Sequence, residues 1–144
     1  MKTAIFPGSF DPFTSGHKVL VERGLALFDT IVVAVGVNSD KQYMFGCDER
    51  VKMIRQVFSE QSRVKVVSYS DMTVDLCRRE NAGFILRGVR NTDDMEYEQT
   101  VAAVNRKLAP EIDTVILFAD LEYKDISSTL EREQIIHAGK CIDN

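Results

Sequence analysis

The chain has 144 residues, of which 44% are hydrophobic, and its formal net charge at pH 7 is −4. This length suits one domain over residues 1–144 with a single core, and the acidic balance argues against a nonspecific nucleic-acid binder. Because Cys47, Cys77 and Cys141 lack metal-ligand spacing and no signal peptide or apolar stretch of membrane length is present, we expect a soluble, reduced, cytoplasmic protein without nucleic-acid or membrane partners.

Strand and helix patterns alternate along the chain. Short apolar runs rich in β-branched or aromatic residues predict five strands, at residues 3–6, 31–37, 64–67, 84–86 and 114–118. Helical patterns occupy residues 17–28, 47–59, 71–81, 92–108 and about 128–137. The alternation predicts an α/β class fold, a single Rossmann-like domain with a five-stranded parallel sheet and helices on both faces. Since the chain has no Gly-x-Gly-x-x-Gly fingerprint, a dinucleotide dehydrogenase is not expected.

Residues 6–17, Phe-Pro-Gly-Ser-Phe-Asp-Pro-Phe-Thr-Ser-Gly-His, join the first predicted strand to the first predicted helix. Pro7 and Gly8 are expected to end the strand, Ser9 offers a hydroxyl, and His17 opens the helical pattern. Backbone N–H groups and an imidazole can therefore converge on an anion at this helix start. The loop predicts a site for nucleotide phosphates, although an ordinary strand-to-helix turn can contain the same residue types.

Polar and charged residues follow every predicted strand. In chain order they are Ser9 and His17, then Lys41, then Asp71 to Thr73, then Arg87 and Arg90, and finally Ser127 to Thr129. The carboxyl ends of parallel strands meet at one edge of the sheet, where ligands bind at the point at which the strand order reverses. The sequence therefore predicts one composite site at that edge.

Several of these residues also have a purely structural interpretation. Lys41 could be a solvated loop lysine, and the helix dipole alone explains Asp93 and Asp94 in the first turn of a helix. Residues 126–129 could be only a helix cap, and His137 fits a surface position. Arg87 is the strongest candidate, because a lone charge directly after a buried strand is unusual.

The tetrapeptide Thr14-Ser-Gly-His17 resembles the signature (His/Thr)-x-Gly-His of the nucleotidyltransferase superfamily. Further matching segments are Pro7-Gly-Ser-Phe-Asp-Pro12, Met44-Phe45, Glu49-Arg50, Leu86-Arg-Gly-Val-Arg90, Glu96-Tyr-Glu98, Asn105-Arg106 and Ile126-Ser-Ser-Thr129. Together they resemble the bacterial phosphopantetheine adenylyltransferase family, and Thr14 favours this branch over relatives that begin the tetrapeptide with His. The resemblance implies transfer of AMP from ATP to 4′-phosphopantetheine, giving dephospho-coenzyme A and pyrophosphate in coenzyme A biosynthesis.

The same resemblance implies the site residues. The acceptor would be bound by Ser9, Lys41, Thr73 and Arg87, and Thr73 would bind it through its backbone. ATP would be bound by Ser9, Phe10, His17, Gly88, Val89, Arg90, Glu98, Tyr123, Lys124, Asp125, Ile126, Ser127, Ser128 and Thr129. His17, as transition-state stabiliser, Lys41 and Arg90 would be catalytic. Mg²⁺ is the expected ion, with no protein ligand predicted for it; a homohexamer is the expected assembly, and coenzyme A is a candidate feedback ligand.

The acceptor pocket is expected to include the segment after the third strand. There Met72, Thr73 and Val74 offer apolar surface and free backbone groups, which suit a pantetheine arm better than a sugar or glycerol. Two other classes remain open: an enzyme that adenylylates or cytidylylates a different phosphate, and a noncatalytic nucleotide sensor with the same fold. The acceptor profile discriminates the first, and the presence of His17 argues against the second.

Overall fold

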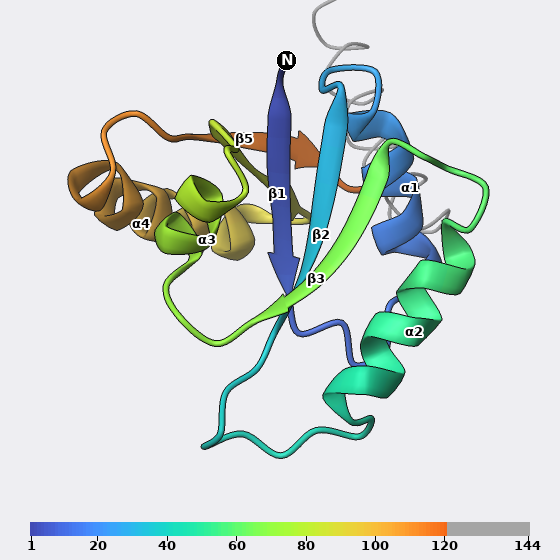
Figure 1. Cartoon of the computed structure of the whole chain (residues 1–144). Helices are drawn as coiled ribbons and strands as arrows, with labels where there is room; N and C mark the ends of the chain where they lie inside the picture. Colours follow the sequence, from blue (N-terminus) through green and yellow to red (C-terminus); the bar gives the residue numbers. More distant parts are fainter. Residues whose placement is uncertain (121–144) are drawn as a thin grey trace, which may run out of the picture.

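The computed structural model describes residues 1–120, which contain one five-stranded sheet with all its strands parallel. The strands are β1 (Thr3–Gly8), β2 (Thr30–Gly36), β3 (Val64–Tyr69), β4 (Phe84–Val89) and β5 (Asp113–Phe118). Their order across the sheet is β3-β2-β1-β4-β5 (Figure 1). The predicted fold class is therefore confirmed, while the helix expected near residues 128–137 lies outside the described residues.

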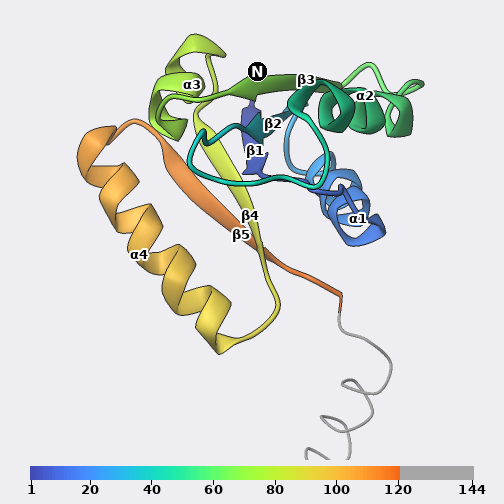
Figure 2. The same ribbon diagram turned by 90° about the horizontal axis from the view of Figure 1, so that it is seen from below.

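Within residues 1–120 four helices cover the two faces of the sheet: α1 (Ser15–Gly24), α2 (Cys47–Val57), α3 (Thr73–Arg79) and α4 (Thr92–Leu108). Helices α1 and α2 lie on one face, and α3 and α4 lie on the other (Figures 1 and 2). Alternate strand residues supply the two cores, because successive side chains of a strand point to opposite faces. Phe6 packs in the core under α1 and α2, and Ile5 packs in the core on the α3 side.

Helix α1 differs by several residues from its expected range. It begins at Ser15 because the hydroxyl of Thr14 accepts the amide of His17, which caps the helix. It ends at Gly24, which packs directly against the sheet: an added Cβ there would lie 2.7 Å from Ile31 Cδ1. The carbonyls of the turn that follows are then satisfied by Arg63, which donates to Leu25 O and Phe28 O.

Strand β1 continues through Pro7 and Gly8, so the expectation that these two residues end it is wrong. Both pair with β2, opposite Ala34 and Val35. The pairing with β4 covers only Ala4 and Ile5. Beyond Ile5 the strand β1 therefore separates from β4, and on that side a proline breaks no ladder hydrogen bond.

Strand β4 is three residues longer than expected, because β5 pairs with it along its whole length, from Phe84 to Val89. Arg87 therefore lies within a strand rather than after one. The chain runs outward from β1 in one direction through β2 and β3, and then crosses to β4 and β5 on the other side. The reversal of strand order falls between β1 and β4, where an open parallel sheet binds its ligands.

Candidate active site

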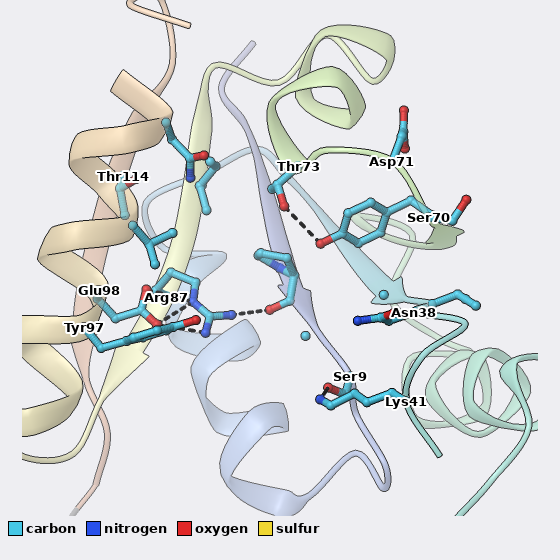
Figure 3. Close-up of a pocket in the computed structure, with 18 of the residues that line it drawn as sticks. Ser9, Asn38, Lys41, Ser70, Asp71, Thr73, Arg87, Tyr97, Glu98 and Thr114 are labelled. Carbon is cyan, nitrogen blue, oxygen red and sulfur yellow. Dashed lines mark hydrogen bonds and ion pairs between the residues drawn. The ribbon is translucent and has the colours of Figure 1, made fainter. Parts of the chain in front are cut away.

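Two neighbouring cavities open at the carboxyl edge of the sheet. The first has a volume of about 770 Å³ and extends from the loop after β1 toward β3, α3 and α4 (Figure 3). The second has a volume of about 780 Å³ and lies between the β1 loop, α1 and the end of β4. Six residues line both cavities: Pro7, Gly8, Ser9, Arg87, Tyr97 and Glu98. The two cavities thus meet where β1 and β4 diverge.

The four residues predicted to bind the acceptor all line the first cavity. They are Ser9, Lys41, Thr73 and Arg87. The Lys41 ammonium lies 3.4 Å from the Ser9 hydroxyl, although the two residues are 32 positions apart in the sequence. On the opposite side the Thr73 hydroxyl is hydrogen-bonded to that of Tyr69 over 3.1 Å. Burial raises the pKa of Tyr69 above its ordinary value, so this hydroxyl keeps its proton at neutral pH.

The apolar wall of the first cavity differs from the expected one. Val74 is 1% exposed in the core and Met72 does not line the cavity, because α3 begins at Thr73 and turns Val74 inward. Apolar surface comes instead from Ile85 on β4 and from Val101 and Ala102 on α4. The sequence could not show this contribution, since α4 reaches the cavity only through the packing of the sheet.

Six of the residues predicted to bind ATP line the second cavity. They are Ser9, Phe10, His17, Gly88, Arg90 and Glu98. Val89 lines neither cavity, because its side chain is buried in the sheet and its carbonyl accepts the amide of Ala119. The remaining predicted ATP contacts, residues 123–129, lie outside the described residues.

His17 has one ring nitrogen committed to the backbone. Its Nδ1 accepts the amide of Thr14 over 2.9 Å, and the Thr14 hydroxyl lies 3.1 Å from the same nitrogen. A neutral ring in this arrangement carries its proton on Nε2. Burial lowers the pKa of His17 below its ordinary value, and the nearby positive charges of Arg87 and Arg90 lower it further. The side chain is therefore a neutral donor at neutral pH.

Aromatic rings hold the imidazole in place. The ring centroids of Phe10 and Phe13 lie 5.0 and 5.2 Å from that of His17. Phe10 has a positive φ of 50°, which a residue with a side chain seldom adopts. Its ring packs so closely on the end of β1 that a Cβ on Gly8 would lie 2.7 Å from Phe10 Cζ. Gly8 therefore lets the loop bend back over the sheet beside His17.

Arg87 and Glu98 form an ion pair at the boundary of the two cavities. Nε of Arg87 donates to both carboxylate oxygens of Glu98 at 3.0 Å, and Nη2 donates to Oε1 at 2.8 Å. Nη1 of Arg87 donates to the carbonyl of Pro7 and so bridges the gap between β4 and β1. The Glu98 side chain is 6% exposed and that of Arg87 is 30% exposed. The carboxylate thus lies behind the guanidinium and orients it toward the cavities (Figure 3).

Arg90 is paired with Asp94, for which the helix dipole alone was the expected explanation. Nε of Arg90 and its backbone amide each donate to Asp94 Oδ2 at 3.2 Å. Hydrogen bonds from the Arg90 side chain and backbone hold the pKa of Asp94 below its ordinary value. Both residues line the second cavity. The spacing i, i+4 was visible in the sequence, but Arg90 precedes α4, so a helix-pair rule did not identify the contact.

The described residues hold no group of three or more His, Cys, Asp or Glu side chains that could bind a metal ion. None of the helices in that part of the chain is long and apolar enough to cross a membrane.

The sequence model of the cytidylyltransferase-like family matches residues 5–134. A phosphopantetheine adenylyltransferase of Flavobacterium johnsoniae is 46% identical over 140 residues, which are 97% of this chain and 91% of the relative. One of Bacteroides fragilis is 47% identical over 133 residues, 92% of this chain and 88% of the relative. The chain belongs to the phosphopantetheine adenylyltransferase family. The resemblance predicted from the motifs is therefore confirmed.

Solved structures of lower identity share the fold of this adenylyltransferase family member. A lipopolysaccharide core biosynthesis protein of Thermoplasma volcanium has a TM-score of 0.62 at 20% identity, covering 85% of this chain and 98% of its own. A bifunctional NMN adenylyltransferase/ADP ribose pyrophosphatase of Francisella tularensis, complexed with AMP and a manganese ion, has a TM-score of 0.60 at 16% identity, covering 85% of this chain and 38% of its own.

Proposed function

We propose that this protein transfers AMP from ATP to 4′-phosphopantetheine, giving dephospho-coenzyme A and pyrophosphate. This agrees with the names of its relatives, which confirm the enzyme class predicted from the sequence. The observation that carries the proposal is the junction of two cavities at Ser9, Arg87 and Glu98. One cavity has the cations and apolar wall that suit an acceptor with a phosphate and a long arm, and the other has a helix start and a neutral imidazole that suit a nucleotide phosphate.

The reaction requires no nucleophile from the protein. A phosphate oxygen of the acceptor attacks the α-phosphorus of ATP, the bond from this phosphorus to the bridging oxygen of the β-phosphate breaks, and pyrophosphate leaves with the bonding electrons. The protein has to bring two polyanions together and to stabilise the charge that grows on the α-phosphate and the leaving group. In this proposal Lys41 and Arg87 hold the acceptor phosphate, and Arg90 faces the β- and γ-phosphates together with residues 127–129.

His17 would donate from Nε2 to the α-phosphate. Support comes from the amide of Thr14, which occupies Nδ1 and leaves the proton on the opposite nitrogen. The ring is held before substrate arrives, so little reorganisation is needed as charge develops. A neutral donor also avoids placing a third charge beside Arg87 and Arg90, whose positive charges disfavour protonation of the ring.

We also propose Mg²⁺ as the ion, a cytoplasmic location and coenzyme A as a feedback ligand. The described residues offer no three-ligand cluster, and Mg²⁺ commonly binds through substrate phosphates with few protein ligands. In this proposal the ion enters the second cavity together with ATP, and its role would be to neutralise the charge of the triphosphate. The manganese and AMP in the Francisella tularensis structure support a divalent ion for this fold.

We propose that the protein forms a homo-oligomer, with the expected hexamer as its assembly. Copies of the chain would associate through the face formed by α4 and β5. Glu98 is the only buried residue of α4, which lies wholly within the described residues, and no residue of β5 is buried. Tyr97, Val104, Leu108 and Phe118 are 65, 53, 47 and 68% exposed. Several large, exposed apolar side chains on two neighbouring elements favour an association site there. Light scattering at several concentrations tests the assembly.

The function is tested by pyrophosphate release from purified protein with Mg²⁺, ATP or CTP, and one acceptor at a time. We expect 4′-phosphopantetheine and ATP to be the preferred pair. Nicotinate mononucleotide, choline phosphate and glycerol 3-phosphate should be poor acceptors, because none of them has a long arm that could contact the apolar side chains of Ile85, Val101 and Ala102 in the first cavity. A better rate with any of these three would contradict the proposed acceptor. ATP binding without turnover on any acceptor would instead support a nucleotide sensor.

A further inference from the structure

Arg50 lies in the first turn of α2 and is only 1% exposed. It has the largest fully buried side chain among the described residues. None of the ion pairs within residues 1–120 includes it. Burial of a cation costs several kcal/mol, by order of magnitude, unless hydrogen bonds compensate it. An apolar side chain would fill this volume without that cost. The position of the guanidinium therefore calls for an explanation beyond packing.

The guanidinium of Arg50 joins three chain segments that surround the site. Nη1 donates to Ser9 O in the β1–α1 loop at 2.7 Å and to Gly36 O at the end of β2 at 3.1 Å. Nε donates to Phe45 O in the β2–α2 loop at 3.1 Å. The planar guanidinium presents several donors in fixed directions and so satisfies these three carbonyls at once.

The ring of Tyr43 stacks on the same guanidinium, with Arg50 Cζ 3.9 Å from the ring centroid. The Tyr43 hydroxyl accepts the amide of Asn38 over 2.9 Å, and the carbonyl of Asn38 accepts the amide of Lys41 over 3.0 Å. Nζ of Lys41 lies 6.0 Å from the Tyr43 ring centroid. The loop that carries Lys41 is therefore folded around Tyr43, and Tyr43 rests on Arg50.

Asp11 makes a second connection between the two loops. Its carboxylate accepts the amide of Met44 at 2.6 Å and that of Phe45 at 2.8 Å. Charge-assisted hydrogen bonds of this kind are roughly twice as strong as neutral ones. We call Asp11, Tyr43 and Arg50 the loop clamp. Together they connect the segment that carries Ser9 to the segment that carries Lys41.

We propose that the loop clamp consists of positioning residues, which hold Lys41 beside Ser9 so that both can meet the phosphate of the acceptor. The inference rests on the proposed function. An exposed lysine on a loop of ten residues would otherwise sample many positions, and ordering it only when substrate arrives would reduce affinity. Since Lys41 lines the first cavity and not the second, the loop clamp acts on the acceptor more than on ATP.

Three substitutions test the proposal: Arg50→Lys, Tyr43→Leu and Asp11→Asn. Each should raise KM for 4′-phosphopantetheine roughly 10- to 100-fold, the scale of a small misplacement in a site. KM for ATP should change by less than about threefold, because Lys41 does not line the second cavity and, of the predicted nucleotide contacts, only Ser9 and Phe10 lie in the loop that the clamp contacts. Calorimetric titration with each substrate separately should likewise show a large loss of affinity for the acceptor and a small one for ATP. All measurements are made well below the melting temperature of each variant, with the folded fraction checked by circular dichroism.

Arg55→Met is the matched control. Arg55 lies on the same helix and also donates to a backbone carbonyl, that of Val66 at 3.1 Å, but it does not line either cavity of the site. The substitution should lower the melting temperature without changing either KM. If Arg50→Lys and Tyr43→Leu behave like Arg55→Met, the loop clamp is only structural and the proposal is overturned.

A double-mutant cycle separates action through Lys41 from a general effect on the site. In a Lys41→Ala background, Tyr43→Leu should add little further to KM for the acceptor, since the group that it positions is gone. Full additivity would refute the positioning role. Wild-type protein that releases no pyrophosphate with 4′-phosphopantetheine would instead refute the proposed function, so the two failures are distinguishable. If Arg50→Lys does not fold, Tyr43→Leu still decides the question through the cycle with Lys41→Ala, because Tyr43 itself lines the first cavity and the cycle separates its own contact with the acceptor from its effect on Lys41.

Discussion

The backbone amide of Thr14 donates to Nδ1 of His17 over 2.9 Å, so one hydrogen bond both caps α1 and selects the tautomer of the imidazole. In return the Thr14 hydroxyl accepts the amide of His17. This reciprocal arrangement is a capping box in which a histidine occupies the third helical position. The residue with the proposed catalytic role is thus held by the helix start itself, and its Nε2 is left for a ligand.

We expect His17→Ala to keep the fold and the affinity for ATP and to lower kcat by about 10²-fold or more, the scale for removing one preorganised donor. The loss falls on kcat because the donor acts mainly on charge that develops in the transition state. Steady-state kinetics and calorimetric titration with ATP check this. A kcat near that of the wild type would mean that His17 is structural.

The pH dependence of turnover should reflect His17. Its pKa in the folded protein lies below the ordinary value of 6.5, so the neutral form persists below pH 6.5. Protonation of Nδ1 would break the hydrogen bond from Thr14, so kcat should stay flat from pH 8 to about 6.5 and fall only as the pH drops through the lowered pKa. A fall in kcat already above pH 6.5 would contradict a depressed pKa.

The free energy of unfolding should also decrease as the pH falls below about 6.5, because of the lowered pKa of His17. Between the lowered pKa of the folded state and about 6.5, the unfolded chain binds more protons than the folded one. The contribution of His17 is therefore fully present above pH 6.5 and is lost as the pH falls through the folded value. Urea unfolding of the wild type and His17→Ala from pH 7.5 to 5 checks this, because the variant should lose less stability on acidification. A difference between the two proteins that is constant over this range would refute the linkage.

Lys41→Ala and Arg87→Ala should weaken the binding of the acceptor far more than that of ATP. Arg87→Lys should restore only part of the loss, because an ammonium cannot make two parallel bonds to a phosphate or hold Glu98 and Pro7 at the same time. Calorimetric titration of each variant with each substrate separates the two effects. Equal losses for ATP and acceptor would reject the assignment of these cations to the acceptor phosphate.

Glu98→Gln should reduce the free energy of unfolding by about 1–3 kcal/mol, somewhat less than for a fully buried pair, because the Arg87 side chain keeps 30% exposure. Asp113→Asn is the matched control, since its pair with Arg106 is exposed at 68 and 58% and should contribute less than about 1 kcal/mol. Urea denaturation measures both. Equal effects of the two substitutions would mean that the Arg87–Glu98 pair contributes no more than a surface pair.

Local chemistry in the sequence was sufficient for the fold class and for the expectation that the candidate site residues share one edge of the sheet. Short β-branched runs and the helical periods between them predicted five parallel strands, since strands buried on both faces need continuous apolar side chains. The residues after the strands were predicted to meet because carboxyl ends share one edge, and Lys41 and Ser9 do lie 3.4 Å apart. The motif around His17 and the further matching segments together were sufficient to identify the family.

Only the tertiary structure decided how those residues are held. The pairing of Arg87 with Glu98 and of Arg50 with the carbonyls of Ser9 and Gly36 joins segments whose distance depends on strand order and helix packing. The extent of β1 and β4 also depended on neighbours, because a strand continues as long as an adjacent strand can accept and donate its hydrogen bonds. Residue types and their periods are local properties of a sequence, whereas the partner of a buried charge is set by the fold as a whole.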